Sequence, residues 1–202
     1  MIKMTTFEED VVEIYYNLND FFTIKNIPFS AVETRKGGAG RGEIDILAIH
    51  VKDKNFKNCS HIEASFSMTD GFPHVNSGKT IIRKFFSNDS EAKIKEIVGN
   101  TPYSCIMITS DFKRDTKERL KNKIIKGGGK VLNLVGRDRG NSLILEIQYK
   151  NRTKSITIYT FRNILFKLME IFDKKRLLTK NFQDPRLRTI QHYMHLIKKG
   201  MV

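Results

Sequence analysis

The segment GEIDILAIH, residues 42–50, combines two acids with an otherwise apolar run. Side chains alternate between the two faces of a β-strand, so a strand here places Glu43 and Asp45 on one face. Ile44 and Ile46 then project from the other face. The segment predicts a strand over about residues 43–51 that has one apolar face and one face with paired carboxylates.

A second segment, residues 60–68, alternates in the same way. His61, Glu63 and Ser65 share one of its faces, so Glu63 converges with the two acids of the first strand if the strands are neighbours. Carboxylates held close together repel one another unless a cation neutralises them. We expect Mg²⁺, with Mn²⁺ as a substitute, because Mg²⁺ takes hard oxygen ligands and accepts one or two carboxylates together with a substrate phosphate.

Helical and strand-like segments alternate along the rest of the chain, which favours an α/β fold. The expected helices cover residues 6–24, 79–98, 112–126, 162–175 and 184–199, and the expected strands cover residues 29–34, 43–51, 60–68, 103–109, 130–135, 142–149 and 155–161. Residues 1–135 form the expected αβββαβαβ core, and residues 136–202 form a β-hairpin and a basic helical extension packed on it.

The first expected helix carries a further candidate acid. Glu8 lies one turn before Val11 and is therefore expected to face inward with the apolar stripe, whereas Glu9 and Glu13 are expected on the solvent side. An inward glutamate at a helix start is either a site residue or a partner of the helix dipole, and both interpretations stay open.

This arrangement resembles the PD-(D/E)XK nuclease superfamily, which includes archaeal Holliday-junction resolvases, many restriction endonucleases and repair nucleases. The resemblance rests on a helix bearing an acid, a glycine-rich turn, GEIDILAI on one strand, HIEAS on the next, and then a helix and a strand. It covers about residues 6–135 and implies a restriction-endonuclease-like αβββαβ core, with a mixed central sheet flanked by helices.

The resemblance also implies roles for the acids. Asp45 corresponds to the aspartate of the motif, and Glu63 corresponds to its second acid. Glu8 corresponds to the helix acid of the resolvase-like members, and Glu43 is an accessory acid or a DNA-contacting residue. Such nucleases use Mg²⁺ to polarise the phosphate and to activate water. The implied ligands of the metal are Asp45, Glu63 and Glu8.

One position departs from the family pattern. The motif's lysine, two residues after the second acid, is Ser65 in this chain. In the family that lysine orients or deprotonates the attacking water and stabilises negative charge on the phosphate, which a hydroxyl cannot do as a cation. We expect another cation to replace it, and Lys79, at the start of the following helix, is the first candidate.

The chain carries a net charge of +14, with the excess concentrated in residues 111–130 and 151–202. Such a field favours polyanions, so DNA is the expected partner, although a solvated lysine-rich surface gives the same composition. The residues expected to contact phosphates are Arg35, Lys36, Arg41, Lys113, Arg114 and Lys117. They would give affinity without sequence information, and this affinity falls as salt is added.

Three functions fit these features. The first is a Mg²⁺-dependent DNA endonuclease that hydrolyses phosphodiester bonds in restriction, repair or recombination. The second is a catalytically inactive, nuclease-like DNA-binding protein, for which Ser65 is the argument. The third is a nucleotidyltransferase, because acid-x-acid on a strand also serves that chemistry, but too few residues separate the glycines from Glu43 for the helix that such enzymes carry there.

The sequence contains no run of about 18 apolar residues and no apolar signal-peptide core, which predicts a soluble, cytoplasmic protein without a membrane segment. Residues 156–172 carry enough apolar side chains to cover the sheet or a second subunit. We expect a homodimer, because nucleases that cut both strands often act as two-fold dimers.

Overall fold

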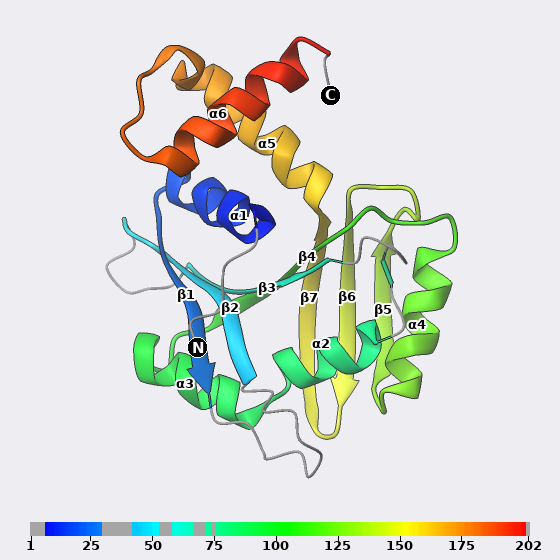
Figure 1. The fold of residues 1–202 in the computed structure, drawn as a ribbon. Helices are drawn as coiled ribbons and strands as arrows, with labels where there is room; N and C mark the ends of the chain where they lie inside the picture. Colours follow the sequence, from blue (N-terminus) through cyan, green and yellow to red (C-terminus); the bar gives the residue numbers. More distant parts are fainter. Residues whose placement is uncertain (1–6, 30–41, 53–57, 67–71, 74–75, 201–202) are drawn as a thin grey trace, which may run out of the picture.

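The computed structural model describes residues 7–29, 42–52, 58–66, 72–73 and 76–200. The chain forms an α/β fold around a seven-stranded mixed sheet (Figure 1). The strands are β1 (Phe21–Phe29), β2 (Gly42–His50), β3 (Cys59–Ser65), β4 (Tyr103–Thr109), β5 (Lys130–Gly136), β6 (Ser142–Tyr149) and β7 (Arg152–Thr160). The helices are α1 (Phe7–Leu18), α2 (Ser77–Phe85), α3 (Asn88–Val98), α4 (Thr116–Lys126), α5 (Phe161–Lys174), the 3₁₀ turn η1 (Leu177–Thr179) and α6 (Pro185–Lys198).

The sheet has the strand order β1-β2-β3-β4-β7-β6-β5. β1, β2 and β3 pair antiparallel, β4 pairs parallel with both β3 and β7, and β7, β6 and β5 pair antiparallel. The β6–β7 hairpin therefore belongs to the central sheet, because β7 lies directly beside β4. The sheet is continuous across residue 135, where we expected the core to end.

Helices cover both faces of the sheet (Figure 1). α1, α5 and α6 pack on the face that carries Ile46, Ile62 and Ile108. α2 and α4 pack on the other face against the buried side chains of β4, β6 and β7, and α3 packs nearby against Leu47 and Ile49. Because side chains alternate along a strand, Asp45 and Glu63 belong to the face that α2 and α3 cover.

The beginning of the chain differs from our expectation. The first helix ends at Leu18 and not near residue 24, and β1 begins at Phe21. The Asn19 side chain donates to the Tyr15 carbonyl oxygen at 2.7 Å, and Asp20 takes a left-handed conformation with φ 66°, which stops the helix. Pro28 lies within β1, where it is tolerated because β1 is an edge strand.

The long helix expected over residues 79–98 is divided into α2 and α3. Ser87 begins the second helix, since its side chain accepts a hydrogen bond from Ser90 N at 3.3 Å as an N-cap. The break places Lys84 in the last turn of α2. The expected strand over residues 103–109 is confirmed, and the helix expected over residues 184–199 is present as α6, with Asp184 as its N-cap.

Gly78 sets the distance between α2 and α4. A Cβ atom added at Gly78 would overlap the main-chain carbonyl group of Lys123 in α4. The first turn of α2 therefore lies against the backbone of α4, an approach that only glycine permits.

We predict that Gly78→Ala lowers the free energy of unfolding by about 1–3 kcal/mol, because the added methyl group must push the two helices apart. Urea denaturation followed by circular dichroism measures this loss. Lys121→Ala, on the exposed side of α4, is the matched control and should leave the midpoint almost unchanged. An unchanged midpoint for Gly78→Ala would show that the helices do not need this close approach.

Candidate functional site

The site forms where β2 and β3 separate. Their antiparallel pairing runs from Ile49 opposite Cys59 to Ile46 opposite Ile62. One step further along, Ala64 N donates to Asp45 Oδ2 at 2.8 Å, so the side chain of Asp45 replaces a main-chain partner. We call this point the fork. It holds the carboxylate of Asp45 against β3, on the side that Glu63 shares.

Lys84 reaches the fork from α2. Its Nζ lies 3.2 Å from Asp45 Oδ1 and 2.6 Å from Glu63 Oε2, and it donates to the main-chain oxygen of Glu43 at 2.6 Å. Asp45 is 4% exposed and Glu63 is 2% exposed. We refer to Asp45, Glu63 and Lys84 as the acid–lysine cluster. It joins two strands and a helix through buried charges.

Burial and neighbouring charges shift the pKa values of all three residues in this cluster. The pKa of Asp45 is raised to about 6, first by burial and then by the neighbouring Glu63 carboxylate, against the opposing effect of Lys84. Burial also raises the pKa of Glu63, again against Lys84. Burial alone would lower the pKa of Lys84, but the two carboxylates outweigh it and raise that pKa. Lys84 therefore stays protonated, and Asp45 changes its charge near pH 6.

His61 supports Glu63 from the same strand. Its Nε2 lies 2.6 Å from Glu63 Oε1, and its ring packs against Phe85 with 4.9 Å between ring centroids. The pKa of His61 is lowered to about 3, first by burial and then by the charges of Lys84 and Lys154. The ring is therefore neutral, and when Glu63 is ionised its carboxylate accepts from the Nε2–H tautomer of His61. This contact fixes the orientation of the Glu63 carboxylate.

Other predicted site residues lie close to the cluster without joining it. Glu43 is half-buried and contributes its main-chain oxygen to Lys84. Ser65 is half-buried on β3, and its main-chain oxygen accepts from the Thr109 hydroxyl at 2.7 Å. Ser65 thus lies in the strand position expected for the family's lysine, while the cation comes from Lys84.

Glu8 belongs to a different surface of the sheet. It is half-buried on α1, which packs on the face opposite to that of Asp45 and Glu63. The orientation that we expected for the neighbouring acids is wrong, because Glu9 is only 5% exposed. Glu9 precedes the buried Val12 and Tyr16 by three and seven residues, which places it on their side of the helix. Glu13 is also partly buried, and it pairs with Lys25 at 2.6 Å.

The expected cations are distributed over several places. Lys79 is exposed and lies beside α4, so the cation at the acids is Lys84 and not Lys79. Lys113 and Arg114 are exposed just before α4, whereas Lys117 is half-buried and its Nζ donates to the Gly136 carbonyl oxygen at 3.3 Å. The positions of Arg35, Lys36 and Arg41 fall outside the described residues.

Sequence reasoning missed Lys84, although a signal was present. Lys84 lies three residues after Ile81 and directly before Phe85, which are both buried on the inner side of α2. A lysine beside the apolar stripe of a short helix can extend toward the protein interior when a buried carboxylate there can pair with its ammonium group.

We predict that Lys84→Met destabilises the fold more at high pH than at low pH. Without the lysine, the folded pKa values of Asp45 and Glu63 rise further above their unfolded values, so stability is lost as pH rises through that range. The loss should be about 3 kcal/mol or more near pH 8 and clearly smaller near pH 5, as measured by urea denaturation.

Lys93→Met is the control for this prediction. Lys93 pairs with Glu96 at 2.7 Å on the exposed side of α3, and its loss should cost less than about 1 kcal/mol at either pH. Equal losses for Lys84→Met at both pH values would contradict a charge coupling within the acid–lysine cluster.

Comparison with known proteins identified no similar protein. No protein-family model, curated protein or solved structure matches the chain. Among the helices of the described residues, none is long and apolar enough to cross a membrane.

Proposed function

We propose that the protein is a Mg²⁺-dependent DNA endonuclease that hydrolyses phosphodiester bonds on a restriction-endonuclease-like core. The observation that carries the proposal is the acid–lysine cluster at the fork, in which Lys84 contacts both Asp45 and Glu63. Paired carboxylates with an adjacent cation are the groups that phosphodiester hydrolysis needs, because they serve metal binding and charge stabilisation together.

The order of elements supports the nuclease framework. One helix, three antiparallel strands, a helical segment and a parallel strand follow one another from α1 to β4. This order agrees with the αβββαβ core that the resemblance implies. The two acids lie on the adjacent strands β2 and β3, as that resemblance requires.

The donor set fits Mg²⁺. Asp45 and Glu63 present hard carboxylate oxygens, and Mg²⁺ takes one or two carboxylates together with a substrate phosphate and water. Within the described ranges, Glu63 Oε2 accepts no well-formed hydrogen bond although Lys84 Nζ is 2.6 Å away. The same ranges contain no group of three or more His, Cys, Asp or Glu side chains arranged for a metal. The two protein ligands that we propose are Asp45 and Glu63, because both carboxylates contact Lys84 at the fork.

When bound at these carboxylates, Mg²⁺ would polarise the phosphate and lower the pKa of a coordinated water. The residues of the chain stabilise the developing charge and hold the carboxylates in position. Lys84 holds a positive charge beside the carboxylates, where it stabilises the negative charge that develops on the phosphate oxygens. It thereby provides the cation that Ser65 cannot provide. His61 keeps the Glu63 carboxylate in place through its Nε2–H.

DNA is the substrate that the charge supports best. The net charge of +14 attracts polyanions, and Lys113 and Arg114 are exposed where a phosphate backbone can reach them. A homodimer and a cytoplasmic location stay predictions from the sequence, as does a site role for Glu8.

A second candidate is a nuclease-like DNA-binding protein without cleavage. The observation that favours it is that Lys84 already contacts both buried carboxylates, so one of their two negative charges is compensated without a metal. In this case Asp45, Glu63 and Lys84 act as a buried ion cluster that fixes the fork. Mn²⁺ binding distinguishes the two functions, because only the first requires the acids to take a metal.

We predict Mg²⁺- or Mn²⁺-dependent cutting of a panel of linear, supercoiled and branched DNA. The single-turnover rate should fall by about a hundredfold or more in Asp45→Asn, Glu63→Gln and Lys84→Met, because each removes a metal ligand or the charge beside the phosphate. Lys93→Met, on the exposed side of α3, should cut at the wild-type rate.

Two results would decide against this function. Cutting that survives Asp45→Asn unchanged would place the reaction elsewhere. DNA binding without cutting, together with no Mn²⁺ binding by calorimetry at the acids, would establish the second candidate.

We further predict that kcat/KM for DNA cutting rises as the pH rises through about 6. The raised pKa of Asp45 keeps this carboxyl protonated below that pH, and only the ionised form binds a metal. The pH profile should move when the buried counter-charge is removed, so a weakly active Lys84→Met protein should need a higher pH. A profile that is flat between about pH 5 and pH 8 would contradict a role for Asp45 in its ionised form.

A further inference from the structure

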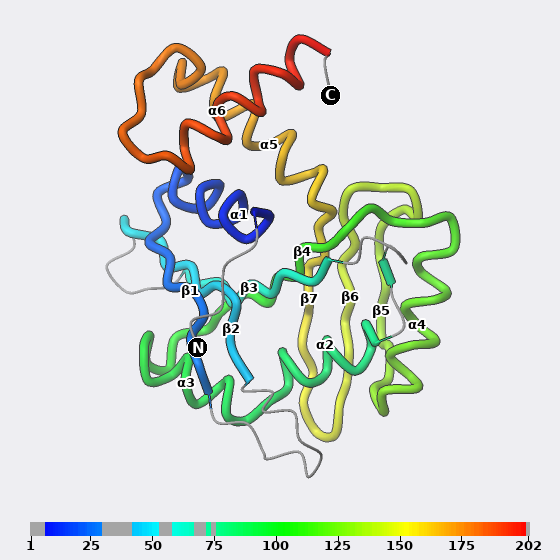
Figure 2. Tube along the Cα trace, in the orientation of Figure 1, coloured from blue at the N-terminus to red at the C-terminus, as the bar shows by residue number. Residues whose placement is uncertain are grey.

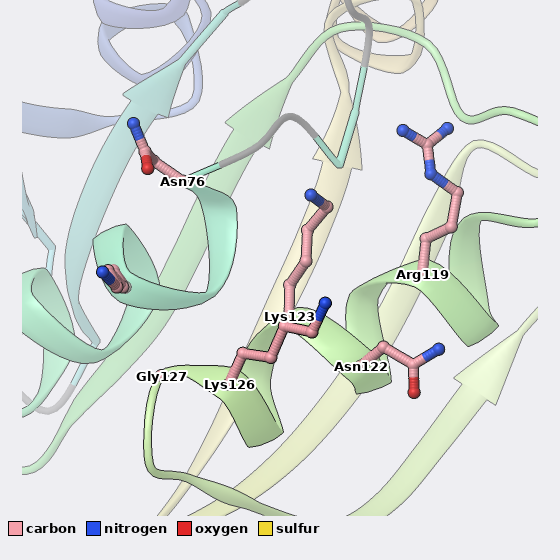
Figure 3. A pocket seen from close by; sticks show the side chains of 7 residues that line it. Asn76, Arg119, Asn122, Lys123, Lys126 and Gly127 are labelled. Atoms are coloured by element: carbon pink, nitrogen blue, oxygen red, sulfur yellow. The ribbon is translucent and has the colours of Figure 1, made fainter.

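A groove of about 490 Å³ lies between the start of α2 and the outer side of α4 (Figure 3). We call it the basic groove. Its lining residues are Asn76, Lys79, Arg119, Asn122, Lys123, Lys126 and Gly127. They include four cations, two amides and no carboxylate. The close approach of α2 and α4 at Gly78 brings the cations of both helices to one groove.

Two cations of the basic groove, Lys79 and Lys126, lie open to solvent. Neither pairs with a carboxylate in the part of the chain that the structure describes. Arg119 lies 3.6 Å from Asp115, at the edge of ion-pair distance, and its NH2 group donates to the Pro73 carbonyl oxygen at 3.2 Å. A groove of this composition has a positive potential that selects anions.

The first turn of α2 adds to this potential. The helix begins at Ser77, and its N-cap residue Asn76 makes no side-chain capping hydrogen bond. The positive end of the helix dipole favours phosphate groups. The groove thus combines side-chain cations and a helix terminus on one surface.

We propose that the basic groove binds the phosphate backbone of DNA away from the acid–lysine cluster. The identity of this ligand rests on the proposed function, whereas the anion-binding chemistry comes from the groove itself. Lys79 and Lys84 lie five residues apart on α2, or about 7.5 Å along the helix axis. Successive residues turn by about 100° around an α-helix, so the two lysines project from different sides of α2. Lys84 contacts the acids and Lys79 lines the groove, so we assign Lys79 to binding.

The closing experiment measures DNA affinity in an Asp45→Asn background, which separates binding from cutting. We compare Lys79→Ala/Lys126→Ala with Lys180→Ala/Lys199→Ala, which removes the same charge from exposed positions near η1 and α6, on the other side of the sheet (Figure 1). Fluorescence anisotropy with a labelled duplex gives the dissociation constant over a range of salt concentrations. All four lysines are exposed, so both double variants should fold, which circular dichroism checks.

The groove variant should bind DNA roughly tenfold more weakly, and the slope of log K against log salt should become less negative by about two. The control should change neither value. Equal losses of DNA affinity in both double variants would overturn the groove as a binding site, because overall charge would then explain the binding. A loss of affinity that appears only with RNA duplexes would overturn DNA as its ligand. Groove-dependent DNA binding by a chain that never cuts DNA would support the groove and contradict the proposed endonuclease.

Discussion

The charge of Lys84 is the interaction on which the site depends. Asp45 and Glu63 are both buried. Two neighbouring buried carboxylates are stable as anions only beside a compensating cation. Lys84 supplies that cation from α2 and also binds the main-chain oxygen of Glu43. The fork, the acids and the helix therefore form one electrostatic unit. A change in any member alters the charge state of the others.

Local backbone geometry explains what could be predicted from the sequence. Period-two alternation identified the face that Asp45 and Glu63 share, since it follows from the pleat of a strand alone. The strand over residues 103–109 and the helix that begins near residue 184 were also predictable, because short-range signals define them. The α/β class with a mixed sheet follows from the same alternation of elements.

Contacts between distant segments explain what could not be predicted. β7 enters the sheet beside β4, so a boundary inferred from chain order at residue 135 has no counterpart in the strand pairing. The inward orientation of Glu9 and the end of α1 depend on how that helix meets the sheet and on the Asn19 side chain. Lys84 was missed for the same reason, because its role requires the break at Ser87 and the docking of α2.

Because Lys84 comes from a helix, its distance from the acids depends on how that helix packs. In the family pattern the lysine lies two residues after the second acid, so one strand fixes both groups. Here α2 carries the cation, and the position of α2 depends on the close approach of Gly78 to the backbone of α4. Figure 2 shows the course of α2 and of α4. A small shift of α2 would separate Lys84 from the acids and leave the pairing of β2 with β3 intact. The same helix carries Lys79 in the basic groove, so the DNA strand that we propose to bind there and the cation at the acids would be fixed to one rigid element.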